Sequence, residues 1–256
     1  MNESDAVNES DRVNEKVYIH ELIDIIGQNR ARYMYHMTAN WSPIGQEERG
    51  QQCYGVWGVV GSTARWPQVV NIWEEDGFDG LARSFQHELG HDTLQDPKLA
   101  KWWAQAAGYR SGGFDRILVP APWMRTGAEA IADGVAGEVH AHVQVQLRPG
   151  AAPEYLAAAH DGSKAMTSRF GWQLTGAWRT AMAGDAECIL LWTIPTWHAW
   201  AEAEKALTAE PGLGRLGAEL DVLSVHRFLM VDAPLSPFRI RRQPARADRT
   251  DAYSEV

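Results

Sequence analysis

Apolar and polar residues alternate along residues 17–26 and again along residues 139–147. Alternation with a period of two is typical of a β-strand that has one covered face. The first segment places Val17, Ile19, Ile23 and Ile25 on one side, and the second places Val139, Ala141, Val143, Val145 and Leu147 there. The opposite sides carry Tyr18, His20, Leu22 and Asp24, and His140, His142, Gln144 and Gln146.

The rest of the chain continues this pattern with two similar series of elements, each in the order strand, helix, strand, strand, helix, strand. The first series is predicted at residues 17–26, 29–38, 52–60, 68–75, 78–89 with 97–107, and 116–121. The second is predicted at residues 139–147, 153–168, 173–182, 187–193, 197–209 and 227–231.

Landmarks recur in the same order in both series, which indicates an internal duplication. His20 matches His142, Gly55-Val56-Trp57 matches Gly176-Ala177-Trp178, and Trp73 matches Trp192. A unit of about 100 residues is the size of a small domain. The predicted organisation is a polar tail over residues 1–16, repeats over 17–134 and 135–235, and an arginine-rich tail over 236–256, which we expect to be solvated or packed on a partner.

The order βαββαβ predicts an α+β fold of tandem ferredoxin-like repeats, each with an antiparallel sheet and both helices on one face. The bare sheet faces must then cover each other, as two facing sheets or a closed barrel. The polar strand rows would point into the space between the sheets. Because unsatisfied buried polar groups cost about 1–3 kcal/mol each, these rows suggest a wet or ligand-filled cavity.

Composition narrows the class of protein. The formal net charge of −9 disfavours nucleic acid as a partner. The sequence has no apolar run long enough for a membrane span and no signal-peptide pattern at its start, so we expect a cytoplasmic protein. Cys53 and Cys188 fall in predicted strands and are expected to be buried free thiols. The 12 tryptophans suit a core or an aromatic-lined pocket.

Several short motifs resemble the dimeric α+β barrel superfamily, and within it the NIPSNAP-type proteins. The motifs are the segment 17–22, the Leu147-Arg148-Pro149-Gly150 turn, Gly176-Ala177-Trp178-Arg179, and the strand ends at Trp73 and Trp192. The resemblance implies a dimeric α+β barrel architecture. Superfamily members include cofactor-free monooxygenases, isomerases, small lyases and haem-handling enzymes. It also implies pairing of barrel halves, and we expect a homodimer.

The polar rows supply the candidate catalytic residues, because histidine transfers protons near neutral pH. These candidates are His20, His140 and His142, with Asp24 as an orienting carboxylate and Glu75 as an alternative base. Local hydrogen bonding is the competing interpretation for each histidine. The candidate substrate-binding residues are Tyr18, Trp57, Asn71, Trp73, Arg179 and Trp192.

One motif favours different chemistry. His87-Glu88-Leu89-Gly90-His91 has the H-E-x-x-H spacing, in which two histidines on one face of a helix bind zinc. However, Gly90 and Asp96-Pro97 predict that the helix ends within the motif, and no third histidine or glutamate follows before residue 129.

Three hypotheses therefore remain. The favoured one is an enzyme, without a cofactor, that acts on a small and largely apolar organic molecule by proton transfer, as an isomerase, lyase or monooxygenase. The second is a zinc hydrolase that uses His87, Glu88 and His91. The third is a non-catalytic carrier of a small ligand or haem.

Overall fold

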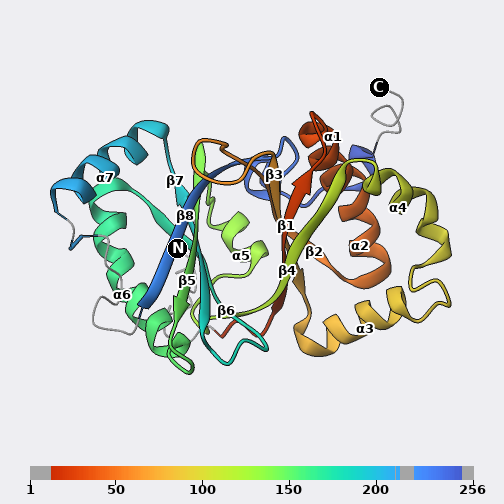
Figure 1. The fold of residues 1–256 in the computed structure, drawn as a ribbon, viewed down its shortest axis with the longest axis horizontal. Coiled ribbons are helices and arrows are strands. Elements are labelled where there is room, and N and C mark those ends of the chain that lie inside the picture. The colour runs from red at the N-terminus through yellow and green to blue at the C-terminus, as the bar shows by residue number, and fades with distance from the viewer. Residues whose placement is uncertain (1–12, 211, 214–221, 250–256) are drawn as a thin grey trace, which may run out of the picture.

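The computed structural model describes residues 13–210, 212–213 and 222–249. Within them, eight strands form a closed antiparallel barrel in the order β1-β3-β2-β8-β5-β7-β6-β4. The helices of the two repeats lie on opposite sides of this barrel, at the right and the left of Figure 1. Each repeat has the predicted βαββαβ order, so the α+β fold with tandem ferredoxin-like repeats is confirmed.

The first repeat differs from the prediction mainly between its first two strands, where one helix was expected and three consecutive helical segments occur. It comprises β1 (Val17–Ile25), α1 (Arg30–Tyr35), the π-helix η2 (His36–Trp41), α2 (Ser42–Arg49), β2 (Gln52–Val59), β3 (Gln68–Glu75), α3 (Gly77–Leu89), η3 (Pro97–Leu99), α4 (Ala100–Ala107) and β4 (Arg110–Pro120).

The second repeat follows a short connecting helix, α5 (Gly127–Ala132), which a Thr126–Glu129 capping box begins. The repeat comprises β5 (Val139–Leu147), α6 (Ala152–Phe170), β6 (Gln173–Thr180), β7 (Glu187–Ile194), α7 (Trp197–Ala209) and β8 (Val222–Asp232). Helix α6 has Pro153 in its first turn and ends at Gly171, whose φ of 70° is a left-handed conformation that glycine adopts easily.

Two short strand pairings join the repeats into one barrel. Trp57–Val59 of β2 pairs with residues 230–232 of β8. Leu118–Pro120 of β4 pairs with residues 178–180 of β6. Because both bridges involve equivalent strands, the barrel has an approximate twofold relation between its halves. The duplicated chain therefore closes internally the kind of barrel that the resemblance assigns to two chains.

The Gly-x-Trp landmark has a steric reason that is the same in both repeats. A Cβ atom built on Gly55 would lie 2.1 Å from the Trp57 ring, and one built on Gly176 would lie 1.9 Å from the Trp178 ring. Each indole therefore lies back along its own strand, over the glycine two residues earlier. Both tryptophans are fully buried in the main core. The motif is thus a packing device of the barrel interior.

Both predicted tails contribute to the fold where the structure describes them. Asn14 is buried and donates hydrogen bonds to the Tyr18 hydroxyl (3.0 Å) and the Met124 carbonyl (3.1 Å). Helix α8 (Pro237–Ile240) buries Phe238 against Tyr54. The segment with η4 (Arg246–Asp248) lies beside α2, where Arg246 pairs with Glu47. Asn14, Pro237, Phe238 and Pro244 are buried within the protein, whereas Arg239, Arg241, Arg242 and residues 245–247 are exposed, as expected for a solvated tail. Residues 1–12 and 250–256 lie outside the described residues.

Candidate functional site

The predicted polar rows of β1 and β5 do face the barrel interior, and two of their histidines meet there. His20 Nε2 lies 2.9 Å from His142 Nε2, which makes one imidazole the donor and the other the acceptor. Both side chains are fully buried. Burial lowers the pKa of His20 to about 3 and lowers that of His142 well below its ordinary value, with smaller contributions from nearby positive charges. The pair is therefore neutral at pH 7.

This neutral pair predicts acid sensitivity of the fold. In the unfolded chain both histidines regain an ordinary pKa of 6.5 and bind protons that the native pair excludes, so stability falls as the pH drops from 6.5 toward 3. We expect the free energy of unfolding to fall by about 2 kcal/mol for His20 alone between pH 7 and pH 5. Urea denaturation of wild type and a His20→Gln/His142→Gln double variant measures this. An identical pH dependence in both proteins would contradict it.

Several other interior polar groups contact one another, whereas Trp57 Nε1, Trp178 Nε1 and Asp232 Oδ1 have no hydrogen-bond partner among the described residues. His140 contacts Asp232 Oδ2 through Nε2 (3.1 Å) and Thr193 Oγ1 through Nδ1 (3.2 Å). The Tyr18 hydroxyl donates to Glu74 Oε2 at 3.0 Å. These contacts leave His140 and Tyr18 fully buried. Much of the polar rows is therefore satisfied within the protein, while His20 Nδ1 and His142 Nδ1 are buried without a hydrogen-bond partner among the described residues.

Asp24 also faces the interior, yet it lies at the far end of β1 from the histidine pair. Its carboxylate accepts a hydrogen bond from Gln68 Nε2 (3.1 Å) and pairs with Arg65 (3.1 Å). The charged pair nearest to the histidines is instead Arg116 and Glu187, joined by two hydrogen bonds of 2.8 and 3.1 Å. The prediction that Asp24 orients a catalytic histidine is therefore wrong.

Other predicted site residues point to the outer faces of the sheets. Arg179 lies next to the interior-facing Trp178 in sequence, and so faces outward, where it pairs with Asp185 at 2.7 Å. Trp192 packs against Trp172 beneath the second-repeat helices. Glu75 accepts a hydrogen bond from Gln51 Nε2 (2.8 Å) beneath the first-repeat helices. Of the predicted substrate-binding residues, Tyr18 and Trp57 face the interior. Arg179, Trp192 and Glu75 point to the outer faces and therefore cannot contact His20.

Asn71 and Trp73 also point outward, and there they converge on a carboxylate that the sequence prediction missed. Glu21 Oε2 accepts hydrogen bonds from Asn71 Nδ2 (2.8 Å) and from Trp73 Nε1 (2.9 Å). The Asn71 amide also donates to the Tyr33 hydroxyl at 3.0 Å. We call Glu21, Tyr33, Asn71 and Trp73 the Glu21 cluster. Its members come from β1, α1 and β3 and are fixed by register, since Glu21 lies directly opposite Asn71.

The electrostatics of the Glu21 cluster suit a group that exchanges protons. Burial raises the pKa of the Glu21 carboxyl, and the neighbouring Asp115 carboxylate raises it further. The hydrogen bonds from Trp73 and Asn71 oppose this rise. Burial likewise raises the pKa of Tyr33, so its hydroxyl stays protonated. A carboxyl with a raised pKa is a common general acid or base.

The surroundings of the cluster are aromatic and partly open. Tyr33 and Trp73 belong to an apolar cluster that also contains Met37, Trp41 and Trp102. Helix η2 supplies two of these side chains, and single π-helical turns are frequent at functional sites. Glu21 itself is only half-buried, as are the adjacent residues Ile19, Trp103, Tyr109 and Ile117. Part of the Glu21 side chain is therefore exposed to solvent, while burial of its carboxyl group raises the pKa.

The second repeat has apolar residues in place of Glu21 and Asn71. Val143 is the equivalent of Glu21. Its partner on the neighbouring strand is Leu190, which is the equivalent of Asn71. Both are buried apolar side chains. The fold is therefore stable with an apolar pair at this position, and a desolvated carboxylate there costs free energy. This asymmetry favours a functional role for Glu21 over a structural one.

The sequence does contain a signal for Glu21. It occupies the centre of the outward row that otherwise consists of Val17, Ile19, Ile23 and Ile25. A charged residue in a strand row that must face helices is an informative exception to the period-two pattern. The prediction overlooked it because it treated the opposite, more polar row as the functional one.

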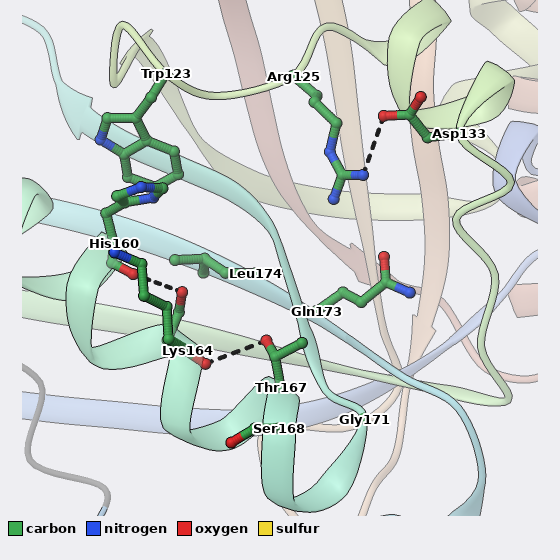
Figure 2. A pocket seen from close by; sticks show the side chains of 11 residues that line it. Trp123, Arg125, Asp133, His160, Lys164, Thr167, Ser168, Gly171, Gln173 and Leu174 are labelled. Carbon is green, nitrogen blue, oxygen red and sulfur yellow. Dashed lines mark hydrogen bonds and ion pairs between the residues drawn. The ribbon is translucent and has the colours of Figure 1, made fainter. Parts of the chain in front are cut away.

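A groove of about 750 Å³ lies on the second repeat, between α6, β6 and the segment before α5 (Figure 2). The Trp123 and His160 rings are tilted by 38° with centroids 4.4 Å apart, and Arg125 pairs with Asp133 at 3.3 Å. Most of its lining is polar, so it is unlike the apolar cavity expected from the sequence. The lining residues are Trp123, Arg125, Asp133, His160, Ser163, Lys164, Thr167, Ser168, Gly171, Gln173 and Leu174.

The H-E-x-x-H motif does not form one helical face. Helix α3 ends at Leu89 with Gly90 as its C-cap, so His91 lies beyond the helix, as Gly90 predicted. Glu88 forms an ion pair with Arg49 of α2. The set of His87, Glu88 and His91 is therefore not arranged as the zinc-hydrolase hypothesis requires.

Comparison with known proteins shows the fold. No protein-family model matches the sequence, and no curated protein matches it significantly. Among solved structures, the "putative monooxygenase from Lactobacillus acidophilus NCFM" is similar, with a TM-score of 0.53, 9% identity, and coverage of 85% of this chain and 94% of that one. An "anthrone oxidase-like protein" is similar with a TM-score of 0.55, 10% identity, and coverage of 86% and 92%.

The chain has the dimeric α+β barrel fold. Both similar structures extend over both repeats, and at about 10% identity the likeness concerns the fold alone. No described helix has the length and apolar character that crossing a membrane requires. Cys53 and Cys188 are free and buried, as expected.

Proposed function

We propose that this protein is an enzyme that transfers a proton to or from a small, largely apolar organic molecule, with Glu21 as the acid–base group. The observation that supports this most is the Glu21 carboxyl itself, which combines a raised pKa with hydrogen bonds of 2.8 and 2.9 Å from Asn71 and Trp73. The favoured hypothesis from the sequence placed this chemistry between the sheets. The proposal keeps the chemistry and moves it to the outer face of the first repeat.

The cluster offers complementary parts for such a reaction. The ionised Glu21 carboxylate would accept a proton from an acidic C–H or O–H group of the substrate. The Asn71 Oδ1 atom is buried and accepts no hydrogen bond from the described residues, so it could take one from a substrate hydroxyl. The Tyr33 hydroxyl and the nearby Arg110 guanidinium could stabilise the anion that forms. The aromatic side chains around the cluster would bind the apolar part of the substrate.

This proton transfer can lead to two outcomes. Return of the proton to another carbon gives an isomerase. Reaction of the carbanion with molecular oxygen converts a CH₂ group and O₂ to a carbonyl and water, which is a cofactor-free monooxygenase reaction. The names of the two similar structures support the second outcome. The finer NIPSNAP-type resemblance and a homodimer remain predictions.

A second location for the chemistry is the His20–His142 pair, which the sequence proposed as catalytic. The observation in its favour is the direct contact of 2.9 Å between the two ring nitrogens. Its full burial and low basicity make it the weaker candidate. Carriage of a ligand or haem without catalysis remains a third hypothesis, and a Soret band in the purified protein would favour haem.

The experiment that tests the proposal is a substrate screen of the purified full chain. The panel contains polycyclic phenols, anthrones and hydrophobic ketones, and oxygen uptake and ultraviolet absorbance are both recorded. We expect turnover of at least one compound without added metal or cofactor, with a rate that rises as Glu21 ionises. Absence of turnover across the panel, together with ligand binding that Glu21→Gln leaves unchanged, would overturn the proposal.

A further inference from the structure

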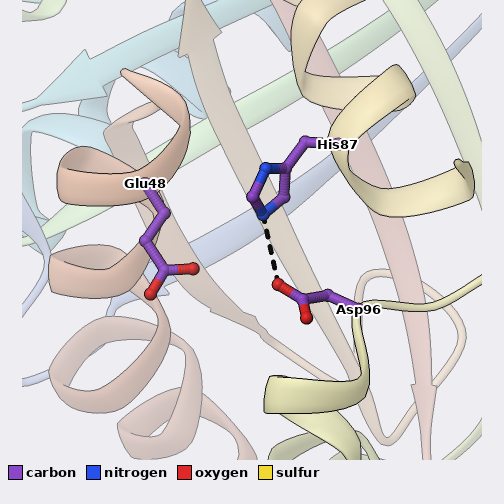
Figure 3. Close-up of side chains that lie close together, drawn as sticks. All are labelled: Glu48, His87 and Asp96. Atoms are coloured by element: carbon purple, nitrogen blue, oxygen red, sulfur yellow. Dashed lines mark hydrogen bonds and ion pairs between the residues drawn. The ribbon is translucent and has the colours of Figure 1, made fainter. Parts of the chain in front are cut away.

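His87, the first residue of the H-E-x-x-H motif, lies close to side chains from outside the motif. His87 lies on α3 and faces Asp96, which precedes η3, and Glu48, which lies on α2 (Figure 3). One ligand atom from each of the three side chains lies within 4.8 Å of the other two. Three elements distant in sequence therefore bring an imidazole and two carboxylates to one point on the outer side of the first repeat.

The distances between these atoms fit a shared cation. His87 Nε2 lies 3.2 Å from Asp96 Oδ2. Two ligands bound to zinc at about 2.0–2.1 Å in tetrahedral geometry are separated by roughly 3.3 Å. This contact is a hydrogen bond, and its length also matches the separation of two adjacent ligands on one ion. Glu48 is exposed, so its side chain can rotate to close the remaining distance.

The Asp96 carboxylate is held in position independently of His87. Its Oδ1 atom accepts a hydrogen bond from the Lys98 amide at 2.9 Å, as the N-cap of η3. The residue is only 3% exposed, although it borders the surface. The Oδ2 atom is left directed toward His87 and Glu48. A buried and oriented carboxylate of this kind costs less conformational entropy to bind a cation than a free surface side chain does.

The contact between α2 and α3 fixes the third side chain near the others. Arg49 follows Glu48 in sequence and pairs with Glu88, which follows His87. The side chains of this pair are 6% and 13% exposed, so it is a buried link between the two helices. Glu48 and His87 are thus carried by helices whose relative position is already set. The motif's glutamate serves this link instead of acting as a base.

We propose that Glu48, His87 and Asp96 bind a divalent transition-metal ion, with zinc as the ion best matched to this donor set. One imidazole with two carboxylates favours zinc over magnesium or calcium, which prefer oxygen ligands alone. Water would complete the coordination. The ion would link α2, α3 and η3, and its role would be to stabilise the first repeat. This site is independent of the Glu21 cluster.

The test is titration of Zn²⁺ into EDTA-treated, dialysed full-length protein by isothermal calorimetry, with Mg²⁺ in a parallel arm. We expect one Zn²⁺ per chain and no Mg²⁺ binding. His87→Ala should weaken Zn²⁺ binding at least 100-fold, and Glu48→Gln and Asp96→Asn about 10-fold each. Zn²⁺ should also raise the melting temperature of wild type but not of His87→Ala, because it binds only the folded state.

His198→Ala is the matched control, since His198 is an exposed histidine on α7, the equivalent helix of the second repeat. It should bind Zn²⁺ like wild type. His91→Ala should retain binding within about threefold. If His91→Ala weakened Zn²⁺ binding as much as His87→Ala, the ligands would be the residues of the H-E-x-x-H motif, and the proposal would be overturned. Unchanged Zn²⁺ binding in both His87→Ala and Glu48→Gln would also overturn the proposal. Because Glu48 is exposed, its variant should fold.

Discussion

Glu21→Gln is expected to reduce kcat/KM by about 10²- to 10⁴-fold, the usual contribution of a general acid or base. The substitution keeps the shape of the side chain and its oxygen acceptor for Asn71 and Trp73. It removes only the ability to take up and release a proton. The protein should therefore remain folded, with a melting temperature near that of wild type, and most of the loss should appear in kcat. Steady-state kinetics on the substrate found in the screen measure this effect.

Glu75→Gln is the matched control for this prediction, because Glu75 is a buried carboxyl on the same sheet face whose pKa burial also raises. It should keep kcat/KM within about threefold of wild type. If Glu75→Gln lost activity while Glu21→Gln retained it, the base would be Glu75, which the sequence predicts as the alternative base. If only His20→Gln or His142→Gln lost activity, the catalytic group would be the interior pair.

Gly176→Ala is expected to destabilise the fold by about 3 kcal/mol, at the upper end of typical overpacking costs. The added methyl group would lie 1.9 Å from a ring carbon of Trp178, so the indole must leave its position over the strand. Trp178 is fully buried and contacts Tyr18 and Tyr54, so its displacement disturbs the barrel interior. Urea denaturation followed by tryptophan fluorescence measures the change.

Gly55→Ala should have a similar cost, because Trp57 lies over Gly55 in the same way. Gly212→Ala is the control, since a Cβ atom there would meet no other atom within 4 Å. It should change the free energy of unfolding by less than about 0.5 kcal/mol. Equal stability of the Gly176→Ala and Gly212→Ala variants would show that the Gly-x-Trp arrangement is not a packing constraint.

The fold could be predicted from the sequence because its signals are periodic and occur twice. The alternation along β1 and β5 gave the two faces of each sheet, and the register confirms that His20 and His142 share the inner one. The repeated order of Gly55-Val56-Trp57 and Gly176-Ala177-Trp178 indicated equivalent strands. These features depend on local pattern, which a single sequence carries in full.

The candidate site was harder to predict because it depends on contacts between elements. Polar character alone favoured the inner row, where some of the groups satisfy one another, as His140 does with Asp232 and Thr193. The Glu21 cluster requires Tyr33 to approach from α1, and the π-helical turn that follows α1 has no simple sequence period. For the same reason, the partners of His87 could not be inferred from its neighbours in sequence.

The position of a bound ligand would show where the chemistry takes place. A crystal structure of the Glu21→Gln variant with the substrate identified in the screen would show it, since this variant should bind without turnover. We expect the ligand on the outer face of the first repeat, with its reacting atom within hydrogen-bond distance of residue 21 and in contact with Asn71. A ligand between the two sheets beside His20, or in the groove beside His160, would contradict it.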